Sequence, residues 1–190
     1  MRFNVPITVA VGTAAAIAVF VSFAEFKIPH ANAWTSSIIF VCGFLTFIYA
    51  MYWDSSDTER TTRRSDVAFW LHLLAAPLII HPVFSSLGIL QGQESLFSML
   101  LVVLLYLLMT SVSLAVDRRA FMVSSLVYVL YALSSLINSY GDVGYSFALT
   151  GIFMGAALLL LSAFWHRVRI YLVAKLPDRV RVYLPKGREL

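Results

Sequence analysis

Charged residues and cysteine are both scarce in this sequence. Asp, Glu, Lys and Arg make up 13% of the chain, whereas apolar residues make up 60%. A soluble domain carries roughly a quarter charged residues, so the composition excludes an ordinary water-soluble enzyme, a disordered chain and a coiled coil. Cys42 is the single cysteine of the sequence, so an intrachain disulfide is excluded. We expect it to be a small buried apolar residue. The mean hydropathy of +0.83 is typical of a polytopic membrane protein.

Long apolar runs are abundant. A transmembrane helix needs about 20 mostly apolar residues, and six windows satisfy this: 6–24, 34–53, 67–87, 96–116, 120–140 and 145–165. The sequence therefore predicts an all-α fold, a polytopic membrane helical bundle of six transmembrane helices over residues 1–166. The longest polar connection is Asp54–Asp66. Because the other connections are short, we expect sequential spans to pack as antiparallel hairpins.

The distribution of basic residues predicts the orientation. If the N-terminus lies inside, every Lys and Arg except Lys27 falls on the inner side. Cytoplasmic segments carry such an excess of basic residues, so we expect an N-in, C-in, multi-pass protein of the inner (plasma) membrane. A cleaved signal peptide ending near Ala31–Ala33 is the alternative. Against it, the first apolar run is about twice as long as a signal core, and Glu25 and Lys27 separate it from the cleavage motif.

Chemical motifs are missing as well. No predicted span has a charged residue in its middle third, and such residues mark proton relays, ion pathways and retinal sites. The chain also lacks a nucleophile elbow, a phosphate-binding glycine loop and a zinc motif. These absences argue against a proton-coupled transporter and an ion pump, and they favour a non-enzymatic protein without a cofactor.

The third span contains the candidate binding residues His72, Pro77, His81 and Trp70. Pro77 cannot donate a backbone hydrogen bond, and Pro82 follows His81, so we expect a helix that is kinked and broken near its outer end. Broken spans form binding sites in some transporters. Prolines in membrane helices are also commonly accommodated by their neighbours, without any function.

His72 lies on the same helical face as Ala68, Ala75 and Ala76. Such a small-residue stripe lets another helix approach closely, so we expect His72 to face the bundle interior. Its predicted partner is a hydroxyl group, a backbone carbonyl or a water. His81 lies about 13 Å further along the axis and on roughly the opposite face, so the two histidines cannot clamp one haem. No His or carboxylate pair has metal-motif spacing, and we expect no metal site.

Two further features predict contacts. Gly151 and Gly155 form a GxxxG motif, and Gly12 with Ala16 forms a weaker equivalent; both predict close helix packing, within one subunit or in a dimer. The basic amphipathic tail, 167–190, alternates basic and apolar residues, which favours anionic lipid at the cytoplasmic face over nucleic acid. Its candidate membrane-surface residues are Arg167, Arg169, Lys175, Arg179 and Arg181.

The block ERTTRRSDVAFWLHLLAAPLIIHP, residues 59–82, resembles one in uncharacterised bacterial integral membrane proteins. The resemblance extends from about Phe44 to the segment FWHRVR, and it implies a bacterial inner-membrane protein of unknown activity. We therefore expect a non-enzymatic accessory or scaffold subunit, with a homo-oligomer or another membrane protein as partner. The alternative is a small permease or channel for a neutral or weakly polar solute, which would use the proline-containing third span.

Overall fold

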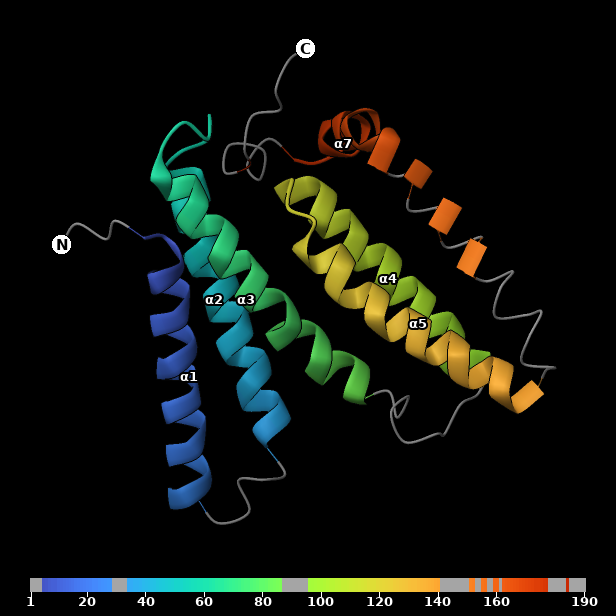
Figure 1. Ribbon diagram of the computed structural model, residues 1–190, viewed down its shortest axis with the longest axis horizontal. Coiled ribbons are helices and arrows are strands. Elements are labelled where there is room, and N and C mark those ends of the chain that lie inside the picture. The colour runs from blue at the N-terminus through green and yellow to red at the C-terminus, as the bar shows by residue number, and fades with distance from the viewer. Residues whose placement is uncertain are drawn as a thin grey trace. The chain divides into compact units, whose positions relative to one another are not determined.

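The computed structural model describes residues 5–28, 34–86, 96–140, 151–152, 155–156, 159–160, 162–177 and 184. Over these residues the chain is helical and contains no strand (Figure 1). The helices are α1 (Ile7–Lys27), α2 (Thr35–Ser55), α3 (Arg63–Ser86), α4 (Leu96–Val116), α5 (Ala120–Tyr140) and α7 (Trp165–Ala174). Most of the predicted sixth span, 145–165, lies outside the described residues. The all-α prediction is confirmed for the described part of the chain.

Helices α1, α2 and α3 are each long and apolar enough to cross a membrane. Their composition explains this, because an all-round apolar helix of about 20 residues matches the hydrocarbon thickness. Helices α4 and α5 have the bounds predicted from the sequence. The predicted start of the polar connection at Asp54 is wrong, because α2 continues to Ser55.

The third helix is continuous, so the predicted break near its outer end is wrong. Pro77 and Pro82 both lie inside α3. Pro77 and Leu73 are exposed, so the carbonyl that loses its helical partner lies on the outer face of the helix. A proline removes one hydrogen bond, and a helix with a packed opposite face survives this loss.

The chain divides into two compact units, with the boundary between Val83 and Phe84. The first unit contains α1, α2 and α3 up to Val83, and the second contains α4, α5 and α7.

In the first unit, small residues allow α2 and α3 to approach closely. The buried residues of α2 are Gly43, Thr46, Ala50 and Asp54, which recur at helical spacing. A Cβ added at Gly43 would lie 2.8 Å from Cβ of Leu78 and 2.9 Å from its backbone carbonyl carbon. This contact is too close for any side chain at position 43.

A tight connection between α2 and α3 sets the start of α3. The carboxylate of Asp57 accepts hydrogen bonds from the backbone N–H groups of Thr61 and Thr62, at 3.2 and 2.9 Å, and from the Thr62 hydroxyl at 2.6 Å. The Thr62 hydroxyl is the main cause that lowers the pKa of Asp57. Arg60 has a φ of 55°, in the left-handed region, and its N–H donates to the carbonyl of Asp57 at 3.0 Å.

In the second unit, Asp117 ends α4 in a Schellman motif. Its φ is 57°, and the N–H groups of Asp117 and Arg118 donate to the carbonyls of Leu114 and Ser113. Glycine is the usual residue at such a position. The side chain explains the aspartate, because Trp165 Nε1 of α7 donates to Asp117 Oδ1 at 2.8 Å.

Candidate functional site

The first unit contains a buried pair of ionisable side chains, His72 and Asp54. His72 Nε2 of α3 lies 3.2 Å from Asp54 Oδ2 of α2, and both side chains are 0% exposed. The imidazole ring also packs edge-on against Phe47, with a centroid distance of 5.5 Å. His72 is therefore enclosed by two residues that lie two turns apart on α2.

The position of the pair follows from the packing of the two helices. Ala68, Ala75 and Ala76, which lie on the His72 face of α3, are all 0% exposed. The prediction that His72 faces the interior is confirmed. Its predicted partner was a hydroxyl, a carbonyl or a water, whereas the observed contact is with a carboxylate.

Burying this pair costs free energy, and the contact between its two members requires one particular orientation of the helices. Removing an imidazole and a carboxylate from water costs several kcal/mol, and their mutual attraction offsets this cost only at good geometry. Such a pair contributes little net stability, but it disfavours any rotation of α2 that separates its members. A proton could move between the two groups, yet neither group is exposed to bulk solvent in this structure.

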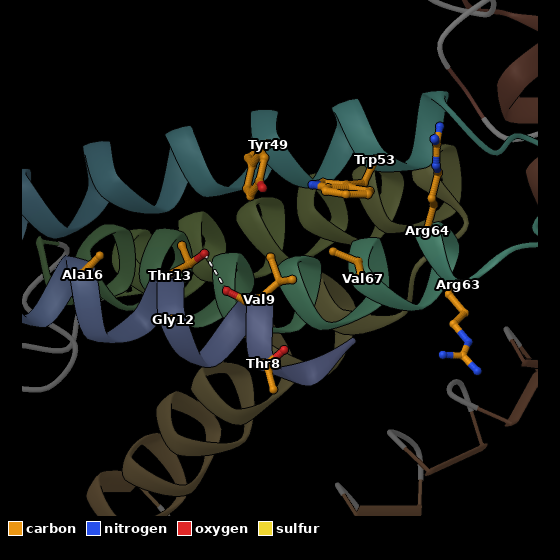
Figure 2. A pocket seen from close by; sticks show the side chains of 10 residues that line it. All are labelled: Thr8, Val9, Gly12, Thr13, Ala16, Tyr49, Trp53, Arg63, Arg64 and Val67. Carbon is orange, nitrogen blue, oxygen red and sulfur yellow. Dashed lines mark hydrogen bonds between the residues drawn. The ribbon is translucent and has the colours of Figure 1, made fainter. Parts of the chain in front are cut away.

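An open groove of about 970 Å³ lies between α1, α2 and α3. Figure 2 shows Arg63 and Arg64 at one end of the groove and Ala16 at the other. The lining residues are Thr8, Val9, Gly12, Thr13, Ala16, Tyr49, Trp53, Arg63, Arg64 and Val67. His72 and Pro77 are not among these residues.

The walls of the groove are mainly apolar. The hydroxyl group of Thr8 donates to the carbonyl of Val5, just before α1, at 2.7 Å, and that of Thr13 donates to the carbonyl of Val9 at 2.8 Å. The hydroxyl protons of both threonines are therefore already used by the local backbone. Trp53 contributes a buried indole N–H with no hydrogen-bond acceptor among the described residues.

The four candidate binding residues of the third span lie in different environments. His72 is fully buried in the pair with Asp54. Trp70 packs against the small buried cluster of α1, α2 and α3. Pro77 and His81 are exposed on α3. These four residues do not form one site.

The candidate packing glycines lie in open space. A Cβ added at Gly12, Gly151 or Gly155 would meet no atom within 4 Å. Gly12 and Ala16 line the groove instead. Close packing at Gly151 and Gly155, within one subunit or in a dimer, therefore stays a prediction.

The tail residues divide into exposed and buried positions. Arg167 and Lys175 are exposed, and their cationic groups lie over the rings of Phe164 and Tyr171. Arg169, which the sequence assigns to the membrane surface, is only 4% exposed. Its Nε lies 3.7 Å from Asp117 Oδ1, because α7 packs against the end of α4. The remaining candidates, Arg179 and Arg181, lie outside the described residues.

Sequence reasoning missed Asp54 and Gly43, which decide the geometry of the pair. The signal was present, since Gly43, Ala50 and Asp54 are seven and four residues apart and lie on one face of a helix. Asp54 was assigned to the polar connection because it begins a run of polar residues. Only the packing shows that α2 includes it.

Among the described residues, no three His, Cys, Asp or Glu side chains gather where they could hold a metal ion. No family model, curated protein or solved structure matches this chain. The site is therefore interpreted from its own geometry.

Proposed function

We propose that this chain is a six-span bacterial inner-membrane protein with cytoplasmic termini, and that it acts as a non-enzymatic accessory or scaffold subunit. The observation that carries the proposal is the enclosed pair of His72 and Asp54. A transport or catalytic pair has to meet its solute or water, whereas this pair is 0% exposed and contacts Phe47. Its geometry supports a role in fixing the rotation of α2 relative to α3.

The distribution of basic residues supports the proposed topology, because all of them except Lys27 fall on one side in a six-span model. The test places single cysteines at Glu59 and at Gln91 in a Cys42→Ala background. An impermeant maleimide should label Glu59→Cys from the cytoplasmic side and Gln91→Cys from the opposite side of intact cells. Labelling of both cysteines from one side would overturn the six-span topology.

A transport assay separates the scaffold from the permease. Vesicles containing the purified full chain should take up glycerol or urea no faster than protein-free vesicles, measured by light scattering after an osmotic step. The His72→Leu variant should behave in the same way. Faster uptake that is lost in His72→Leu would replace the scaffold proposal with the permease.

A further inference from the structure

The groove between α1, α2 and α3 plays no part in the proposed scaffold role. We propose that it binds one anionic phospholipid, whose phosphate lies at Arg63 and Arg64 and whose acyl chain lies along Gly12 and Ala16. This inference rests on the proposed membrane location, and it goes beyond the scaffold role by naming a ligand.

The shape of the groove fits an acyl chain. From Thr8 to Ala16 the wall formed by α1 runs for about 12 Å, and Val9 and Val67 add apolar surface. The volume of about 970 Å³ lies at the upper end of small-molecule sites, so the groove holds a headgroup region and part of a chain. The groove is open at Gly12, because a Cβ added there would meet nothing within 4 Å.

The charge of the groove fits a phosphate at one end. Arg63 and Arg64 are exposed side chains that line it, and guanidinium groups bind phosphate oxygens with two parallel hydrogen bonds. Asp66, the acidic residue in the first turn of α3, is not among the lining residues. The site therefore has apolar walls and a cationic end, which complements an anionic amphiphile.

Trp53 lies between the two regions, as Figure 2 shows by its place beside Tyr49 and Arg64. Its indole nitrogen is buried, so the lipid would meet the tryptophan ring and not the N–H group. Tryptophan rings are enriched at the boundary between headgroup and acyl chain.

The test measures lipid binding to the full chain in mild detergent by native mass spectrometry. Phosphatidylglycerol and phosphatidylcholine with identical acyl chains are compared, so that only the headgroup charge differs. We expect phosphatidylglycerol to bind about tenfold more tightly, since each basic residue near the lipid favours the anion. The Arg63→Gln/Arg64→Gln variant should bring the two affinities within about twofold of each other.

Two controls separate the groove from general surface charge and from misfolding. The Lys27→Gln variant removes an exposed basic residue outside the groove, and it should keep the preference. Gly12→Leu should fill the groove and weaken the binding of both lipids. Gly151→Leu, at another open glycine, should leave the binding of both lipids unchanged. Melting temperatures of all variants are compared to exclude loss of the fold.

Three outcomes would overturn the lipid site. The first is an equal affinity for both lipids in the natural chain, and the second is a preference that Lys27→Gln removes as fully as the groove variant does. The third is displacement of phosphatidylglycerol by inorganic phosphate at equal concentration, which would indicate a site for a free anion. Cysteine labelling tests the membrane topology separately, so a correctly threaded chain without lipid preference overturns this inference alone.

Discussion

Replacing His72 by leucine should destabilise the first unit more than replacing Asp54 by leucine, although the two residues form one pair. His72→Leu puts an apolar side chain beside the Asp54 carboxylate, which is 0% exposed. Asp54→Leu instead leaves an imidazole, which is neutral over much of the physiological range. A buried carboxylate costs more free energy than a buried neutral imidazole, so the two changes are unequal.

The magnitudes follow from the two end states. In His72→Leu the carboxylate can take up a proton, and at pH 7 this costs about 4 kcal/mol, since aspartate in water titrates near 3.9 and each pH unit corresponds to about 1.4 kcal/mol. Any other contact of the carboxylate lowers this cost, so it is an upper bound. In Asp54→Leu the lost hydrogen bond costs about 1–3 kcal/mol. We expect His72→Leu to lose up to about 3 kcal/mol more stability at pH 7.

The pH dependence and the double variant provide two further tests of the unequal effects. Protonating the carboxylate costs about 1.4 kcal/mol less at each lower pH unit, so the deficit of His72→Leu should shrink between pH 7 and pH 5. The double variant His72→Leu/Asp54→Leu should be more stable than His72→Leu, because replacing both members of a buried pair is often neutral.

The assay is the free energy of unfolding in mixed micelles at increasing dodecyl sulfate content, measured by circular dichroism. The four chains form a double-mutant cycle. A His72→Leu variant within about 0.5 kcal/mol of the natural chain at pH 7 would refute the reasoning. So would strictly additive effects of the two single changes, because the contact between the side chains would then carry no energy.

Four further outcomes are expected. Gly43→Ala should lower the melting temperature, because its Cβ meets Leu78 at 2.8 Å, while Gly12→Ala should leave it unchanged or raise it; equal effects would contradict the close contact. Asp117→Gly should lower the free energy of unfolding by about 1–3 kcal/mol, because Trp165 Nε1 loses its acceptor, although glycine relieves the positive φ. Asp117→Asn should lower the free energy of unfolding by less. A stabilised glycine variant would show that backbone strain dominates. The pKa of Asp57 is lowered, so its contribution to stability is present above about pH 4 and is lost as the pH falls through the folded-state value. The difference in melting temperature between the natural chain and Asp57→Asn should therefore narrow below pH 4. A difference that stays constant with pH would contradict this. Gly151→Leu/Gly155→Leu should reduce the oligomer size in gel filtration if a partner helix packs there, and an unchanged size would end that prediction.

Much of the fold was predictable because it depends on local composition. Helices α4 and α5 begin and end at the predicted residues, since polar connections bound long apolar runs. The interior position of His72 was also predictable, because Ala75 and Ala76 mark a face that another helix can approach. In contrast, two prolines in one helix predicted a break that a packed helix does not need.

The sequence by itself determined the all-helical fold, the apolar character of the helices and the face of α3 that lies inward, because these follow from composition and helical periodicity. Only the tertiary structure decided that Asp54 meets His72, that Gly43 contacts Leu78, and that a groove remains beside α1. Helix α1 is apolar over nearly its whole length, so its hydrophobic pattern does not indicate which side packs, and the side marked by Gly12 and Ala16 lines the groove instead. Contacts between helices depend on crossing geometry and on the volumes of facing side chains, and neither is a property of one segment alone.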